Sequence, residues 1–207
     1  SVFIILHASA SPATYTKEAN SDALNLDSSW VGGTAPGVWG NDTARFINPG
    51  TTAEIGANLV WKGVQMGNNQ VHTINDTPDT FTLTLGSGGV TPSSNARLHV
   101  FPDVVLSAAQ TWSAFRIQAG SSVDTQGFEL TFASSGGSAA AIDDTAPILG
   151  SGNLKVASGG EFTLGGNRSY TGSTTVESSG ILYLNNENAL GDSSTRVLNV
   201  NGGAVGP

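Results

Sequence analysis

The chain has 207 residues, which is enough for one sizeable domain and at most two. Charged residues make up only 12%, about half of the usual ~25%, whereas Gly, Ser, Thr and Asn contribute 27, 24, 21 and 16 residues. The polar surface therefore consists mainly of hydroxyl, amide and backbone groups. This composition excludes a helical bundle or coiled coil, and no apolar run of about 18 residues could form a membrane-spanning helix.

The charge and cysteine content exclude further classes. The formal net charge is −8, from 8 basic and 16 acidic residues, and the basic residues are scattered along the chain. Because no basic patch could neutralise phosphates, neither nucleic acid nor an anionic membrane surface is expected as a partner. Cysteine is absent, which excludes disulfides, thiolate zinc sites and cysteine nucleophiles but is compatible with export of a large all-β protein.

Residues 1–13 are an apolar N-terminal arm with two open interpretations. The run Val2-Phe3-Ile4-Ile5-Leu6 precedes Ala8-Ser9-Ala10, which resembles the end of a secretory signal with its cleavage site, although a basic leading region is missing. In the first interpretation the arm is a leader remnant. In the second it is a retained strand. Burying each of these side chains contributes ~1.5–3 kcal/mol, and a free apolar strand can add to the sheet of a neighbouring subunit.

Residues 14–52 are rich in turns and are predicted to form an N-terminal cap region. Gly and Pro cluster at Val31-Gly32-Gly33, Ala35-Pro36-Gly37 and Asn48-Pro49-Gly50, between isolated aromatic side chains. This pattern does not distinguish a separate cap from the first coils of a repeat.

From residue 53 to residue 207 short alternating segments recur between turns of Gly, Ser, Asn and Asp. Each has apolar residues at positions i and i+2, which places them on one face of a strand, with a polar residue between them. The segments are Phe81–Gly86, Leu98–Val100, Phe128–Phe132, Leu154–Val156, Phe162–Gly165, Leu182–Asn185 and Leu198–Asn201. We therefore predict an all-β fold in this region.

The spacing of these segments favours a solenoid. Gly160–Asn167 matches Gly180–Glu187 with an offset of 20 residues, and short strands with a loose period near 20 are typical of stacked coils. Gly165–Asn167, Tyr170–Gly172 and Asn201–Gly203 are the predicted corners. A β-sandwich is the competing interpretation, because turn signals every 8–12 residues fit it as well.

One part of the chain resembles a known family. The segments Gly150–Leu154, Gly160–Val176, Gly180–Leu184 and Asn188–Gly191 are similar to the autotransporter-associated β-strand repeat over about 50 residues. The resemblance implies a right-handed parallel β-helix, exported to the cell surface or beyond. It also implies a structural or adhesive role without a catalytic signature.

Chemistry-bearing residues are sparse. His7, His72 and His99 lack the spacing of a metal site. Asp143-Asp144 is comparable to the paired carboxylates of pectin-cleaving β-helices, but it is interpreted as a plain turn. Asn75–Asp79 is also interpreted as a turn, with Ca²⁺ binding by its carboxylates as the lesser alternative. No cofactor and no metal are predicted.

Tryptophan side chains could stack on sugars, but we expect them to fill the core or a cap. The four are Trp30, Trp39, Trp61 and Trp112.

The leading hypothesis is a non-enzymatic, secreted or cell-surface structural protein that assembles head to tail into a filament by strand addition between copies of itself. A monomeric adhesin or carbohydrate-binding passenger fragment, with surface glycans as partners, is the alternative, and a polysaccharide-cleaving enzyme is the third hypothesis. The predicted self-assembly residues are Val2, Phe3, Ile4, Ile5, Leu6, Leu198, Val200 and Val205.

Overall fold

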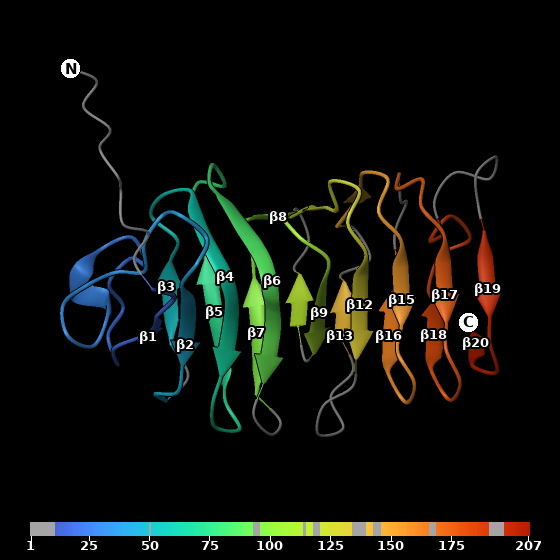
Figure 1. The fold of residues 1–207 in the computed structure, drawn as a ribbon, viewed down its shortest axis with the longest axis horizontal. Helices are drawn as coiled ribbons and strands as arrows, with labels where there is room; N and C mark the ends of the chain where they lie inside the picture. The colour runs from blue at the N-terminus through green and yellow to red at the C-terminus, as the bar shows by residue number, and fades with distance from the viewer. Residues whose placement is uncertain are drawn as a thin grey trace, which may run out of the picture.

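The predicted solenoid fold is confirmed by the computed structural model. It describes residues 11–49, 51–92, 96–113, 115–117, 121–133, 140–142, 146–165, 169–190 and 197–207, with only the backbone at residues 115 and 140–142. Within these residues the chain forms strands β1 to β20 and one short 3-10 helix, η1 (Asp27–Ser29). The strands succeed one another along the long axis of the molecule (Figure 1).

Two sheets form the walls of the solenoid. The first sheet runs in the order β1 (Thr14–Thr16), β2 (Thr43–Phe46), β4 (Leu59–Met66), β6 (Thr82–Pro92), β9 (Gln110–Ser113), β12 (Leu130–Ala133), β15 (Leu154–Val156), β17 (Thr174–Val176) and β19 (Leu198–Val200). A branch of this sheet leaves β6 through β8 (Asp103–Leu106), β11 (Val123–Asp124) and β14 (Ile148–Leu149). The second sheet contains β3 (Thr52–Glu54), β5 (Val71–Asn75), β7 (Arg97–Val100), β10 (Phe115–Ile117), β13 (Ala140–Ile142), β16 (Glu161–Leu164), β18 (Ile181–Leu184) and β20 (Ala204–Gly206).

All strand pairs between these elements are parallel, because each strand pairs with the equivalent strand of the next coil. Val156 lies opposite Val176, and Phe162 lies opposite Leu182, each 20 residues further along. This second register is the one predicted from the match between Gly160–Asn167 and Gly180–Glu187. The alternative of a β-sandwich is wrong, since a sandwich is built from antiparallel sheets.

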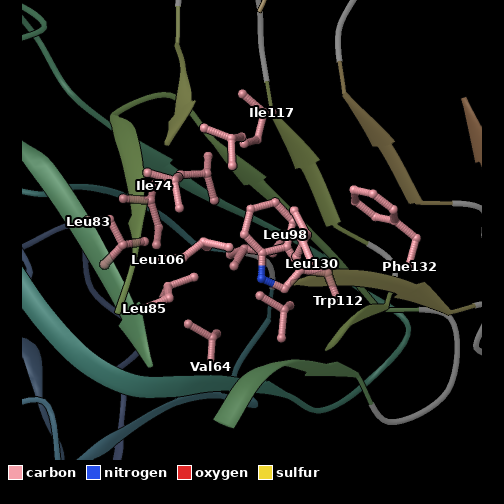
Figure 2. Packing of buried hydrophobic residues seen from close by; sticks show 14 of the residues in the cluster. Val64, Ile74, Leu83, Leu85, Leu98, Leu106, Trp112, Ile117, Leu130 and Phe132 are labelled. Atoms are coloured by element: carbon pink, nitrogen blue, oxygen red, sulfur yellow. The ribbon is translucent and has the colours of Figure 1, made fainter. Parts of the chain in front are cut away.

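The core lies between the two sheets. Alternate side chains of every strand point inward, and Figure 2 shows such residues from both sheets converging, among them Val64, Leu98, Trp112 and Phe132. Phe132 of the first sheet stacks on Phe162 of the second, with ring centroids 3.5 Å apart and an interplanar angle of 7°. Each fully buried side chain of this size contributes ~1.5–3 kcal/mol, so the continuous apolar column stabilises the coil stack.

The predicted segments all contain strands, but the structure shortens some of them. Phe81 and Phe128 precede β6 and β12 instead of belonging to them. Gly202 has a φ of +82°, as expected for a corner, and the Tyr170 ring is buried with its hydroxyl 2.6 Å from Thr174 Oγ1. Residues 166–168 of the third predicted corner lie outside the described residues.

Candidate functional site

The candidate assembly site is the last coil, which we define as β19 and β20. In the first sheet Val156, Val176 and Val200 occupy successive positions of one inward-facing ladder. Val156 and Val176 are buried, with 1% and 0% of their surface exposed, whereas Val200 is 47% exposed. Leu198 follows the buried Thr174 in the neighbouring ladder and is 37% exposed. These side chains continue the core but are covered on one side only.

The second sheet repeats this arrangement. Phe162, Leu182 and Val205 form one ladder, in which the first two are buried and Val205 is 38% exposed. A hollow of about 430 Å³ lies beside β20, and its lining includes Leu184, Val205 and Pro207. The structure therefore brings the three predicted C-terminal interface residues, Leu198, Val200 and Val205, into one coil.

The backbone of the last coil also presents open edges. Within the described residues β19 pairs only with β17, and β20 pairs only with β18. Val197 O accepts from the Thr174 amide and the Asn201 amide donates to Val176 O, both at 2.8 Å, so residues 197 and 201 face β17. Because the polar groups of a strand alternate in direction, those of Leu198 and Val200 point away from β17. Such an edge can accept a further strand.

The other half of the predicted interface, Val2, Phe3, Ile4, Ile5 and Leu6, lies outside the described residues. The place where the arm joins the fold is described. The amide of Ala13 donates to Asp42 Oδ1 at 3.0 Å, and its carbonyl accepts from the Thr43 amide at 2.8 Å. The chain then enters β1, the first strand of the first sheet.

The N-terminal end of the solenoid is closed by its own chain. The Val31 amide donates to Thr16 O at the edge of β1, and the Leu24 amide donates to Glu54 O at the edge of β3, both at 2.8 Å. Residues 18–42 thus occupy backbone groups that would otherwise be free at this end, while β1, β2 and β3 themselves belong to the two sheets. The two ends of the solenoid are therefore chemically different.

Side chains complete the N-terminal closure. Trp30 is buried between Phe46 and Trp61, with centroid distances of 6.3 and 5.9 Å, and its Nε1 donates to Leu24 O at 2.9 Å. Figure 1 shows η1, which directly precedes Trp30, at the outer end of the stack. Trp30 therefore covers the first inward-facing aromatic residues of the core.

Lys17 is a component of this closure that sequence reasoning missed. Its side chain is buried, and Nζ donates to the carbonyl oxygens of Glu18 and Asn20 and to Asn20 Oδ1. Burial lowers the pKa of Lys17, against the opposing effect of the Asp22 and Glu18 carboxylates. A single Lys in a turn-rich segment is ordinarily exposed, so the sequence carried no signal for this role.

Exposed large apolar side chains are concentrated in two segments. Of the eleven among the described residues, four lie between residues 26 and 39 and four between 197 and 205; the full set is Leu26, Val31, Val38, Trp39, Val71, Phe101, Phe128, Val197, Leu198, Val200 and Val205. The long middle of the solenoid contributes only three. Apolar surface that remains to be covered is thus concentrated in the cap segment and the last coil.

The tryptophans divide between core and surface. Trp30, Trp61 and Trp112 are buried, which confirms the expectation for them. For Trp39 the expectation is wrong, because this side chain is 82% exposed. It follows Gly37 in a turn whose backbone is bonded to the Asp42 carboxylate, and that turn holds the ring away from the core.

The histidines are separate from one another. His72 is buried in the core of β5 beside Phe46, its Nε2 has no hydrogen-bond partner, and burial lowers its pKa. His99 lies between Thr73 and Arg116 in the outward ladder of the second sheet. Its pKa is lowered first by burial and then by the charges of Arg116 and Arg97. His7 lies outside the described residues.

The carboxylates do not form a site of the predicted kinds. Asp143-Asp144 lies outside the described residues. In the Asn75–Asp79 turn, Asp76 Oδ2 accepts from the Phe81 amide at 2.6 Å, and Asp76 Oδ1 has no partner. Among the described residues no group of three or more His, Asp or Glu side chains is arranged to hold a metal ion.

No protein-family model matches the chain, and comparisons with curated proteins and with solved structures give no match either. In the part of the chain that the structure describes, no helix has the length and apolar character needed to cross a bilayer.

Proposed function

We propose that this protein is a non-enzymatic structural subunit that assembles head to tail into an extracellular filament by strand addition. One observation carries the proposal: the inward ladders of the core end at Leu198, Val200 and Val205, which are 37–47% exposed although the same ladder positions one coil earlier are buried. A solenoid gains stability from contact between neighbouring coils, so this coil has an uncovered face that a further strand would bury.

The pairing geometry supports addition of the N-terminal arm in particular. β1 and β19 are the two end strands of the same sheet, and residues 1–10 lead toward β1. An arm laid along β19 of a second copy continues that sheet from one subunit into the next. The bonds of Val31 and Leu24 to the edges of β1 and β3 close the N-terminal end, which leaves the arm as the strand donor.

Such a contact joins two different surfaces, the arm of one copy and the last coil of another. A heterologous contact that does not close into a ring generates an open filament. The concentration of exposed apolar side chains in the cap segment and the last coil supports this arrangement over a side-by-side dimer. Placement outside the cell rests on the resemblance to exported repeat proteins and on the neutral, hydroxyl-rich composition.

The decisive experiment compares the whole chain with a deletion of residues 1–10. Both proteins are examined over a concentration series by size-exclusion chromatography with light scattering and by negative-stain electron microscopy. We expect filaments from the whole chain and monomers from the deletion. A whole chain that stays monomeric at every concentration would contradict the proposed function, and undiminished filaments from the deletion would contradict strand donation by the arm.

Substitutions in the last coil test the acceptor surface. Val205→Lys places a charge in the exposed ladder, where a docked strand would bury it, and is expected to abolish filaments. Thr163→Lys is the matched control, because Thr163 pairs with Tyr183 in the outward-facing ladder of the same sheet. Equal loss of filaments in both variants would show a nonspecific charge effect and would count against the last coil as the acceptor.

A further inference from the structure

A bulge in β6 opens a cleft on the first sheet. The register between β4 and β6 shifts between the pairs Trp61–Leu85 and Gly63–Gly89, so one residue of β4 lies opposite three of β6. Gly89 has a φ of +55°, and a Cβ atom there would lie 2.1 Å from Thr111 O. The bulge therefore requires glycine at this position. It leaves Ser87 and Gly88 exposed beside the neighbouring strands.

The cleft has a volume of about 320 Å³, which is within the range of small-ligand sites, ~300–1,000 Å³. Its polar lining consists mainly of hydroxyl groups, and Glu129 is the only charged residue in it. Thr131 Oγ1 lies 3.4 Å from Glu129 Oε1, next to the position where a ligand hydroxyl could donate to the carboxylate. The residues with side-chain oxygens are Ser87, Thr91, Gln110, Thr111, Ser113, Thr131 and Glu129.

We propose that this cleft binds a neutral saccharide. A carboxylate without a neighbouring cation in the lining disfavours phosphates, sulfates and uronic acids. Many hydroxyl groups around one carboxylate instead match a ligand that carries several hydroxyls, each able to donate and to accept. A peptide strand cannot pair here, because β6, β9 and β12 are neighbours in the interior of the sheet and pair with one another. Recognition must therefore come from side chains.

The affinity of a single cleft is expected to be weak. Its lining contains no aromatic ring on which a sugar could stack, and exposed hydrogen bonds largely replace bonds to water. Repetition of the cleft along a filament would raise the avidity for a polysaccharide. Only this last consequence depends on the proposed filament; the cleft itself belongs to one subunit.

The test is an NMR titration of the ¹⁵N-labelled whole chain with cellobiose, maltose, lactose and N-acetylchitobiose, and with glucuronic acid as the anionic comparison. We expect one or more neutral disaccharides to shift amides of Thr111, Thr131 and Glu129, and glucuronic acid to leave them unchanged. If the whole chain forms filaments, the titration uses Val205→Lys, whose substitution lies outside the cleft lining.

Two cleft variants and one control complete the test. Glu129→Gln removes the charged acceptor and is expected to weaken binding by about tenfold, as for loss of one charge-assisted hydrogen bond. Thr111→Tyr fills the cleft and is expected to abolish binding. Thr175→Tyr makes the same change two coils further along the outward ladder formed by Thr111, Thr131, Lys155 and Thr175, outside the cleft.

The outcomes separate the alternatives. Shifts that disappear in Thr111→Tyr, weaken in Glu129→Gln and persist in Thr175→Tyr would support the site. Absence of shifts with every sugar, shifts confined to other residues, equal binding of glucuronic acid, or equal loss in Thr175→Tyr would overturn it. If the amide spectrum shows that Thr111→Tyr does not fold, unchanged binding by Glu129→Gln still overturns the proposal. Failure of this test leaves the filament proposal intact, because that proposal depends on the last coil.

Discussion

The same substitution at two neighbouring positions of one ladder should have different consequences. Val176 and Val200 lie opposite each other in β17 and β19, but Val176 is fully buried and Val200 is 47% exposed. Replacing Val by Ala removes the equivalent of two methylene groups. At a buried position this costs about 1.6 kcal/mol of transfer free energy, with a further cavity contribution. We therefore expect Val176→Ala to lower the free energy of unfolding by about 2 kcal/mol.

At Val200 the expected loss is about half of the transfer free energy, ~0.8 kcal/mol, because about half of the side chain is already in water. No closed cavity forms there in the monomer. The other half becomes available only when another strand covers the side chain. Val200→Ala should therefore also weaken association by about fourfold, whereas Val176→Ala should affect folding alone.

Urea unfolding followed by circular dichroism measures the first quantity, at concentrations where the protein is monomeric, and sedimentation velocity measures the second. A loss for Val200→Ala as large as that for Val176→Ala would mean that the last coil is already covered within one chain. Unchanged association of Val200→Ala would mean that the partner does not contact this ladder. Either result would refute the reasoning that joins the core to the assembly site.

Three further predictions concern the core and the corners. Phe132→Ala and Phe162→Ala should each cost ~3–5 kcal/mol, with a coupling of ~0.5–1.5 kcal/mol from the stacked rings in a double-mutant cycle by urea unfolding; additive costs would contradict direct stacking. The folded protein holds the pKa of His72 below its usual value, so the unfolded state binds more protons and stability should fall as the pH drops below about 6.5; unfolding from pH 8 to pH 5 should show a smaller fall for His72→Gln, with His99 contributing a remainder of the same sign, and an unchanged slope would contradict this. Gly172→Ala should cost ~1–3 kcal/mol, because its Cβ would lie 2.1 Å from Gly152 O; wild-type stability in a thermal or urea melt would contradict the tight corner.

The sequence was sufficient to predict the strands and, in one place, the register. Inward side chains of a β-solenoid alternate with period two, and this pattern survives in segments as short as Leu154–Val156. The match between residues 160–167 and 180–187 predicted the pairing of β16 with β18, because coils of equal length place equal motifs opposite each other. Parallel pairing then follows from the direction of the chain in each coil.

The rest could not be predicted because coil length varies. Val64 pairs with Val90 across 26 residues, and the excess is accommodated by the bulge in β6. The branch strand β14 contains only Ile148 and Leu149, too few residues for an alternating pattern to be visible. Likewise, burial of Lys17 depends on oxygens that the fold brings to its Nζ, which no local pattern encodes. Composition alone also does not indicate which tryptophan remains exposed.

The unequal ends of the solenoid determine what kind of assembly its physics favours. Each coil is stabilised mainly by its two neighbours, so a coil with one neighbour retains part of the association free energy that built the stack. At the N-terminal end the hydrogen bonds of Val31 and Leu24 and the ring of Trp30 use up this capacity within the chain. At the last coil, Leu198, Val200 and Val205 retain it. Two last coils facing each other would bring parallel sheets together with opposed chain directions, which cannot continue the parallel register. An arm entering β1 continues it, so the polarity of the sheets favours growth in one direction over closure into a symmetric dimer.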